Sequence, residues 1–203
     1  MNQLLNALET RFGQEKITSI QFRDECFYCI DLSKERNVIV IMTSRFNQYC
    51  MPIPEKLNGF EFGELYACLP AYWDVSDPND ETINWAFQWL NKIQNYTRDK
   101  QTWIGDGHTY DCTKYGEQLS RSIKQNYLFI TSPIYLETEL KPLQVDEKTI
   151  HFWGLIPIFS DEIDFKQSKG TVKFKNRLIS KGVSEKIDEY RQTALKTRWV
   201  FFK

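Results

Sequence analysis

Apolar residues recur at helical spacing over residues 3–12, and the helix that this spacing predicts stops at Gly13. Three segments rich in β-branched and aromatic residues follow, with short polar breaks between them. They are ITSIQF (17–22), ECFYCIDL (25–32) and NVIVIMTS (37–44). The pattern predicts one helix and then three consecutive antiparallel strands, followed by a proline-containing loop over 47–59.

The middle of the chain carries the strongest helix pattern. A strand predicted over residues 60–70 ends at Pro70, after which Asp77 offers a helix cap and Pro78 suits the first helical position. A broad apolar stripe follows, which predicts a helix packed on a sheet. The stripe consists of Ile83, Ala86, Phe87, Leu90 and Ile93, widened by Trp85, Trp89 and Tyr96.

Two further strands are predicted in the second half of the chain. Glycines among polar residues predict a loop over 104–118, and the apolar runs NYLFITSP (126–133) and TIHFWGLIPIF (149–159) predict strands. The second run is almost continuously apolar, which indicates a central position in the sheet. The segment 161–170 favours a short helix that ends at Gly170.

The C-terminal part is rich in lysine. KGTVKFKNRLISK (169–181) alternates Lys with apolar residues, which favours an exposed edge strand whose lysines prevent unwanted pairing. Ser184 is a candidate cap for a last helix that runs to about Lys196, and RWVFFK (198–203) favours a strand or a packed tail. The order of elements indicates an α+β fold, a mixed α/β sandwich.

Length and composition place the chain among ordinary globular proteins. It has 203 residues, of which 41% are hydrophobic and 26% charged, as expected for one domain. No apolar run approaches the roughly 18 residues of a membrane span, and the N-terminus lacks the pattern of a secretion signal. Because the five cysteines are scattered, we expect a cytoplasmic protein with reduced thiols.

Charge is balanced overall but uneven along the chain. The net charge of −1 argues against a dedicated nucleic-acid binder. Residues 55–111 nevertheless hold ten acids and four bases, whereas residues 166–203 hold eleven bases and three acids. These regions can pack against each other or form two differently charged faces. A nucleic-acid binder that uses the lysines between Lys166 and Lys186 is therefore retained as an alternative.

The Cys26-x-x-Cys29 motif is interpreted as structural. It lies in a predicted strand, where residues three apart point to opposite faces. A redox pair normally sits at a helix N-terminus, and a zinc site needs further ligands at motif spacing, which a second CxxC would supply but the sequence lacks. We therefore expect no metal and no cofactor.

Histidine chemistry offers one enzymatic alternative. His108 lies in the glycine-containing segment TWIGDGHTYDC, where Asp106 or Asp111 could orient it as a general base. No nucleophile elbow or phosphate-binding loop accompanies it in the sequence. A small hydrolase-like enzyme built around this loop is kept as a hypothesis, and His151 is interpreted as a strand-end residue.

Four blocks in order along residues 37–175 resemble the Suppressor of Fused family. The first block is a strand that ends in Thr before a loop with Met, and the second is an E-L-x-x-x-L-P-x-x-W motif. The third is a helix that ends at a Tyr and is followed by an aromatic loop with Gly-His. The fourth is an apolar strand before an acidic turn. The matching residues are Thr43 and Met51; Glu64, Leu65, Leu69, Pro70 and Trp73; Tyr96, Trp103, Gly107 and His108; and 152–158 with Asp161 and Glu162.

The resemblance implies a non-enzymatic binding fold, a mixed and mostly antiparallel sheet flanked by helices. It implies one such domain over residues 1–203, with 176–203 as a C-terminal helix and tail. Animal members sequester a Hedgehog-pathway transcription factor by pairing with an extended peptide, that is, by β-augmentation. Short bacterial relatives include immunity proteins that neutralise a cognate polymorphic toxin, and the resemblance implies that role here.

Two positions depart from the family pattern. Ser44-Arg45 stands where many relatives have Gly after the Thr. Animal members carry an acidic residue directly before the loop His, whereas here Gly107 precedes His108 and Asp106 lies one residue earlier.

The resemblance implies a protein partner that contacts the chain near the His108 loop, with no membrane involved. Because binding hot spots favour aromatic residues, Tyr96 and Trp103 should contribute more than His108. The acidic residues ahead of the long helix would steer a basic toxin, or would serve only to cap that helix. The predicted partner-binding residues are Tyr96, Trp103, Asp106, His108, Tyr110, Asp74 and Asp77.

Overall fold

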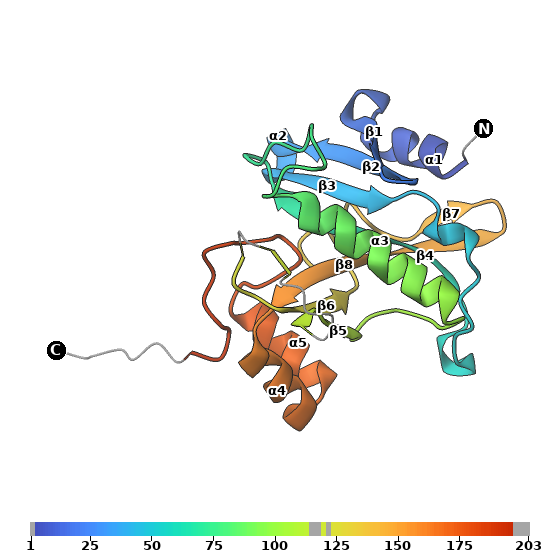
Figure 1. Ribbon diagram of the computed structural model, residues 1–203. Coiled ribbons are helices and arrows are strands. Elements are labelled where there is room, and N and C mark those ends of the chain that lie inside the picture. The colour runs from blue at the N-terminus through green and yellow to red at the C-terminus, as the bar shows by residue number, and fades with distance from the viewer. Residues whose placement is uncertain (1–2, 114–118, 121–122, 197–203) are drawn as a thin grey trace.

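The computed structural model describes residues 3–113, 119–120 and 123–196, and within them a mixed sheet of eight strands lies between helices (Figure 1). The α+β prediction is confirmed. The strands are β1 (Ile17–Phe22), β2 (Glu25–Leu32), β3 (Val38–Thr43), β4 (Phe62–Pro70), β5 (Thr109–Asp111), β6 (Tyr127–Thr131), β7 (Leu143–Val145) and β8 (Lys148–Ile158). The helices are α1 (Gln3–Phe12), α2 (Ser33–Arg36), α3 (Asn84–Asp99), α4 (Ser160–Lys169) and α5 (Thr171–Ser180).

The sheet has the strand order β1-β2-β3-β4-β8-β6-β5, and β7 forms a hairpin with β8. Every pairing is antiparallel except that of β4 with β8, where Leu65 lies opposite Trp153. As predicted from its apolar run, β8 is a central strand. The three N-terminal strands also pair in the predicted antiparallel order, which leaves β1 and β5 at the two edges of the sheet.

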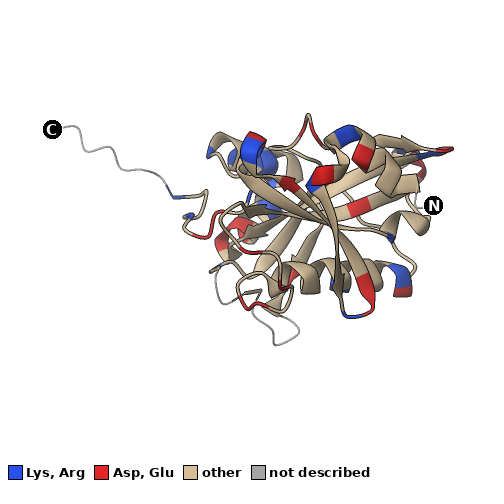
Figure 2. Ribbon diagram, turned by 90° about the horizontal axis from the view of Figure 1, so that it is seen from above, with Lys and Arg blue, Asp and Glu red and all other residues tan. Residues whose placement is uncertain are grey.

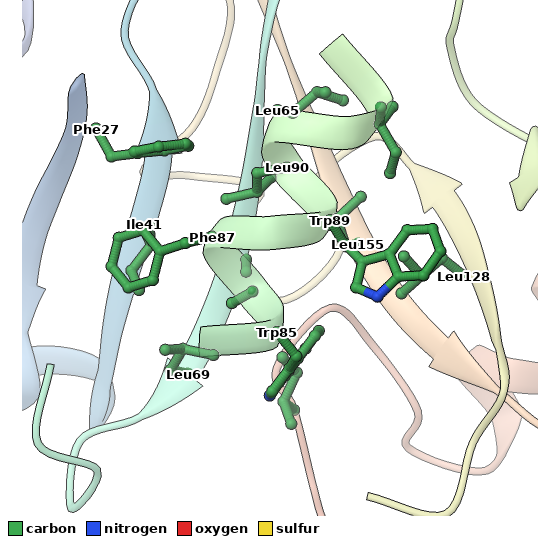
Figure 3. Close-up of a cluster of buried hydrophobic side chains, with 14 of the residues drawn as sticks. Phe27, Ile41, Leu65, Leu69, Trp85, Phe87, Trp89, Leu90, Leu128 and Leu155 are labelled. Carbon is green, nitrogen blue, oxygen red and sulfur yellow. The ribbon is translucent and has the colours of Figure 1, made fainter. Parts of the chain in front are cut away.

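Helix α3 covers one face of the sheet, and its apolar stripe fills the main core (Figure 3). Phe87 lies on the side of α3 towards Ile41 of β3, and Trp89 lies on the side towards Leu128 and Leu155 of β6 and β8. The rings of Phe27 and Phe87 meet edge to face, with centroids 5.4 Å apart. Burial of this wide stripe explains why residues 84–99 form a helix on the sheet.

The opposite face of the sheet is covered by α1 at one end and by α4 and α5 at the other. Side chains alternate between the two faces along each strand. In β8, for example, Trp153 and Leu155 belong to the α3 core, whereas Phe152 packs towards α1 and Ile156 packs towards α4 and α5. The result is a three-layer arrangement of helix, sheet and helix.

The predicted start of the long helix is wrong, because α3 begins at Asn84 and not at Pro78. The carboxylates of Asp77 and Asp80 accept hydrogen bonds from backbone amides two residues further on, at 2.9 and 2.8 Å. Such side-chain bonds stabilise turns in competition with a helix. The segment before Asn84 therefore consists of turns. The apolar stripe is buried as predicted from Ile83 to Ile93, but Tyr96, which was predicted to widen it, is 43% exposed.

The edge strand predicted over 169–181 is wrong, because residues 171–180 form α5. Phe174 and Leu178, four residues apart, are both fully buried, whereas Val172 is 74% exposed. A strand would have placed residues 172 and 174 on the same face, so the buried pair follows the helical period. Helix α4 forms over 160–169 as predicted, and Gly170, with φ +85°, separates it from α5.

The last helix predicted from Ser184 to Lys196 is also absent from the described residues, where this segment consists of turns and a short bridge to β4. The Ile187 amide donates to the Cys68 carbonyl oxygen at 3.0 Å. Arg191 binds the buried carboxylate of Glu162 at 2.7 Å. These tertiary contacts hold the segment in a non-helical conformation, and the predicted strand or tail over 198–203 lies outside the described residues.

Two smaller elements differ in detail from the prediction, whereas the cysteine pair lies in a strand as predicted. The turn predicted over 33–36 is the single helical turn α2, and the loop predicted over 104–118 contains β5, with residues 114–118 outside the described part. Cys26 and Cys29 lie in β2 as predicted, and burial raises the pKa of Cys29 to about 11. No described helix combines the length and the apolar character needed to cross a membrane.

Candidate functional site

The loop between α3 and β5 is held at both ends by main-chain hydrogen bonds. At its start, the Thr102 amide donates back to the last turns of α3 at 3.0 Å. At its end, the Gly107 amide donates to the Ile130 carbonyl oxygen of β6 at 2.9 Å. Gly107 has a φ of +97°, and a Cβ atom there would lie 2.8 Å from Thr171 Cγ2. The loop therefore requires a glycine directly before His108.

Two ring contacts connect the end of α3, the loop and β5. The rings of Tyr96 and Tyr110 meet nearly at right angles, with centroids 5.9 Å apart. The rings of Trp103 and His108 lie 4.3 Å apart in a tilted contact. Trp103 and Tyr110 are partly buried against the main core, whereas Tyr96 is 43% exposed and so lies outside it. The exposed ring of Tyr96 is thus held in place by its contact with Tyr110, which packs on the main core.

These rings line a hollow of about 820 Å³ beside β5, which we name the β5 hollow. It lies at the edge of the sheet, because β5 is the last strand in the order. Four of the seven predicted binding residues meet here, and they are Tyr96, Trp103, His108 and Tyr110. The opposite wall comes from α4 and includes Ile163, Asp164, Lys166 and Gln167.

Asp106 belongs to the same loop but lies outside the β5 hollow. Its carboxylate accepts hydrogen bonds from Lys175 Nζ at 2.9 and 3.0 Å and from the Ser132 amide at 3.2 Å. The carboxylate therefore ties the loop to α5 and to the end of β6. Asp106 thus lies next to the hollow and fastens the loop that leads into it.

Asp74 and Asp77 lie at the other end of α3. They precede its first residue, Asn84, whereas Tyr96 lies in its last turn, so the helix rise alone separates them by ~18 Å. Asp74 accepts a hydrogen bond from the Ser76 amide at 2.9 Å, and Asp77 bonds the amide two residues after it in the same way. The predicted residues thus fall into two separate regions of the surface.

Among the described residues, no carboxylate is hydrogen-bonded to His108. Its Nδ1 atom accepts a hydrogen bond from the Gly105 amide at 3.3 Å. Burial lowers the pKa of the imidazole, and the positive charge of Lys166 lowers it further. Asp106 is bound to Lys175, and Asp111 accepts from the Thr113 hydroxyl at 2.6 Å. Neither bond orients the imidazole, so the hydrolase alternative gains no support from this geometry.

Several basic residues of the C-terminal segment bind groups of the chain itself. Lys175 pairs with Asp106, Arg177 donates to the Ala194 carbonyl oxygen, and Lys186 lies 5.1 Å from the centre of the Tyr135 ring. Basic and acidic residues are both spread over the ribbon (Figure 2). These contacts favour internal complementarity over a nucleic-acid surface.

The markers of the family resemblance lie largely inside the protein. Leu65 and Leu69 are fully buried and Trp73 is nearly so. The carboxylate of Glu64 is also fully buried, where it accepts hydrogen bonds from the Thr43 hydroxyl and from Asn47. Burial raises the pKa of Glu64 to about 7, although these donors act in the opposite direction. Most markers therefore specify the fold, and only the third block reaches the hollow.

Sequence reasoning missed the α4 wall of the β5 hollow, since the acidic turn and its helix carried no binding signal of their own. It also placed His151 at a strand end, whereas this residue lies inside β8 with its ring 4.2 Å from that of Phe60. Among the described residues, no group of three or more His, Cys, Asp or Glu side chains is arranged to hold a metal ion.

Comparison with known proteins identifies relatives of this architecture. The family model described as Suppressor of fused protein (SUFU) matches residues 13–192. A SUFU homolog from Neisseria gonorrhoeae is 15% identical, with a TM-score of 0.66 over 96% of each chain. A search of curated protein sequences finds no match.

Two further solved structures share the fold. The structure of a Sufu–Fu complex contains a chain that is 12% identical, with a TM-score of 0.66 over 94% of this chain and 90% of the other. Drosophila Suppressor of Fused is also 12% identical, with a TM-score of 0.65 over 94% of this chain and 50% of its own.

Proposed function

The chain belongs to the Suppressor of fused protein family, as the match over residues 13–192 shows, and on that premise we propose that it is a non-enzymatic domain whose protein partner binds at the β5 hollow. The whole chain acts as one such domain in this proposal, and no cofactor takes part. The Sufu–Fu complex provides a precedent for a protein partner within the family.

One observation carries the proposal. Residues from the end of α3, the following loop and β5 place two aromatic contacts around a single hollow at the sheet edge. Binding hot spots are enriched in tyrosine and tryptophan because these side chains give large contact areas at small entropic cost. The exposed ring of Tyr96 is the best candidate for direct contact, and Trp103 and His108 form the wall behind it.

The place of β5 in the sheet suggests how the partner binds. An edge strand can accept an extended peptide as a further strand, which is the β-augmentation implied by the family resemblance. A strand added beside β5 would run between the Tyr96–Tyr110 pair and the α4 wall. Main-chain bonds would then supply affinity, and the flanking side chains would supply specificity.

The finer proposal is that the protein is a bacterial immunity protein, located in the cytoplasm, that neutralises a toxin domain. The likeness to a Neisseria gonorrhoeae homolog of nearly equal length supports a bacterial setting. Asp74 and Asp77 are exposed in a loop of acidic turns, and such a surface speeds association with a basic partner. A nuclease-type toxin would present a basic substrate site to these residues.

Co-purification with mass spectrometry identifies the partner, and calorimetric titration then measures its affinity for variants of this chain. Tyr96→Ala should weaken binding by about 1–4 kcal/mol, which is on the order of 5- to 1000-fold. Because its ring is 43% exposed, the melting temperature should change little. Tyr190→Ala, at a tyrosine that is 80% exposed elsewhere, is the matched control and should bind normally.

Two results would count against the proposal. Normal affinity of folded Tyr96→Ala would show that the partner binds elsewhere. A Tyr96→Ala protein that melts early, but whose folded fraction binds normally, would make Tyr96 a structural residue. An upstream reading frame that encodes a large protein with a variable C-terminal domain would support the toxin partner specifically.

A further inference from the structure

The sheet contains a window beside the central strand β8. On that side of β8, pairing with β6 stops where Thr131 lies opposite Gly154, and pairing with β7 begins where Leu143 lies opposite Ile150. The chain leaves the sheet after Thr131 and returns only at Leu143. Among the described residues, therefore, no strand neighbours residues 151–153 of β8 on this side, although β4 pairs with them on the other.

The main chain of Phe152 points into this window. On β6, the Ile130 amide donates to the His108 carbonyl oxygen, so Ile130 faces β5 and the next residue, Thr131, faces β8. The partner of Thr131 is Gly154, and alternate residues of a strand direct their N–H and C=O groups to the same side. Phe152, two residues before Gly154, thus presents both groups to the window. Neither has a hydrogen-bond partner among the described residues.

A cavity of about 600 Å³ occupies the same place. Trp103 and Trp153 of the α3 core line it on one side of the sheet, together with Phe60, whose ring lies 6.1 Å from that of Trp153. Leu140, which packs with α1, lines it on the other side. The cavity therefore passes through the plane of the sheet at the window, beside Phe152. A cavity of this size, with mainly apolar walls and a few placed polar groups, is typical of small-ligand sites.

The electrostatics of the cavity favour an uncharged occupant. The carboxylate of Asp106 on its wall is already paired with Lys175 at 2.9 Å. The imidazole of His151 is hydrogen-bonded to the Gly59 carbonyl oxygen at 2.9 Å. Glu137 and Lys141, which carry opposite charges, line the cavity as exposed residues. The indole N–H of Trp153 has no hydrogen-bond partner among the described residues, but it lies against Gly63 of β4, where a Cβ atom would come within 2.7 Å of it. The Phe152 amide donor and carbonyl acceptor thus remain as main-chain groups for a ligand, and they are complementary to a second amide.

We propose that this cavity binds an uncharged ligand in which an aromatic ring is joined to an amide. The ring lies among Phe60, Trp103 and Trp153, and the ligand's amide exchanges hydrogen bonds with the Phe152 main chain as a neighbouring strand would. Both a free acylated aromatic amine and an aromatic residue within a peptide carry this chemistry. The site is distinct from the β5 hollow, from which Trp103 separates it.

The test uses N-acetyl-L-phenylalanine amide and follows backbone amides by NMR. Saturable binding should shift the Phe152 amide and slow its hydrogen exchange, while the Gly154 amide, already bonded to β6, should keep its exchange rate. N-acetylglycine amide, which lacks the ring, should bind at least 10-fold more weakly. A capped Ala-Phe-Ala peptide that binds as tightly as the single amide identifies a peptide ligand, and weaker binding of the peptide identifies a free amide compound.

A substitution at Gly105 blocks the site without backbone strain. A Cβ atom there would lie 3.5 Å from the Trp103 ring and 3.9 Å from the Trp153 ring, both of which are ordinary contact distances. Gly105→Val should therefore fold and lower the affinity for the probe by 10-fold or more, whereas Val172→Ala on exposed α5 should leave it unchanged. The proposal is overturned if N-acetyl-L-phenylalanine amide in 10-fold excess over ~1 mM protein does not bind the native chain. It is also overturned if the probe binds without changing the shift or the hydrogen exchange of the Phe152 amide.

Discussion

The Thr43 hydroxyl of β3 donates a hydrogen bond to the buried Glu64 carboxylate of β4, so two markers of the family pattern are one structural unit. The Phe46 and Asn47 amides bond the same carboxylate at 3.3 and 3.1 Å. The carboxylate therefore fixes the turn that leaves β3 against the neighbouring strand. A buried acid that gathers this many donors serves the fold, because its hydrogen-bonding capacity is satisfied inside the protein.

This unit predicts a dependence of stability on pH. The pKa of Glu64 is about 7 in the folded protein, above the ordinary value of 4.5. The folded state thus holds a proton that the unfolded state releases, and stability is lost as the pH rises from about 4.5 through about 7. Thermal melting between pH 4.5 and 8 should show this fall, and Glu64→Gln should flatten it. An equally steep fall in Glu64→Gln would assign the effect to another group.

The parts of the fold that were predicted correctly are those specified by local periodicity. The apolar stripe of α3 and the continuous run of β8 bury large surfaces, so their patterns are strong. In contrast, the alternation of Lys173 and Phe174 suited a strand, and the helix formed because Phe174 and Leu178 are buried together. The helix predicted over residues 184–196 is wrong for a different reason, because Arg191 and the buried Glu185 bind partners distant in sequence.

The candidate site shows the same division. Tyr96, Trp103, His108 and Tyr110 were grouped because they are close in sequence, and the structure brings them to one hollow. The α4 wall and the bond from Asp106 to Lys175, two residues 69 positions apart, depend on the packing of elements distant in sequence, which no local pattern contains.

The helical assignment of residues 171–180 predicts contrasting effects at neighbouring positions. Phe174→Ala removes a fully buried ring that meets Phe129 edge to face at 5.2 Å, so the free energy of unfolding should fall by about 3–5 kcal/mol. Val172→Ala should change it by less than about 0.5 kcal/mol, because Val172 is 74% exposed. Urea denaturation compares them. Equal losses would fit a strand in which both residues share a face.

Gly107 is expected to tolerate no side chain. Gly107→Ala combines an unfavourable φ with a contact of 2.8 Å to Thr171, so it should cost about 1–3 kcal/mol of unfolding free energy. Thr171→Ser removes the contacting methyl group and should restore part of that loss in the double variant. Chemical denaturation of both proteins measures the difference. An undiminished stability of Gly107→Ala would show that the loop can move away from α5.

The ion pair of Arg191 and the buried Glu162 should hold the non-helical C-terminal segment in place. The Glu162 carboxylate is fully buried, and Arg191 also donates to the Pro157 carbonyl oxygen at 2.6 Å. Arg191→Met leaves that charge without its partner and should cost about 3–5 kcal/mol. Lys16→Met breaks an exposed pair with Glu35 and should scarcely change the melting temperature. If both variants melt alike, the segment is held by its other contacts.

Association with a basic partner should depend on the acidic turns before α3. The charges of Asp74 and Asp77 lie far from the β5 hollow, so their reversal to lysine acts through the long-range field and not through lost contacts. The association rate constant should fall several-fold at low ionic strength, and its dependence on salt should become weaker, while the dissociation rate constant stays nearly unchanged. Stopped-flow mixing with the co-purified partner at increasing salt concentrations measures each rate.

Lys34→Glu together with Lys56→Glu, which also shifts the charge by four units but in the opposite sense, is the control and should speed association modestly. Because both carboxylates also bond backbone amides in their turns, the melting temperature of the reversed variant separates a local loss of structure from a loss of steering. If the reversed variant associates with the same rate constant as the native chain at every salt concentration, Asp74 and Asp77 serve only their turns.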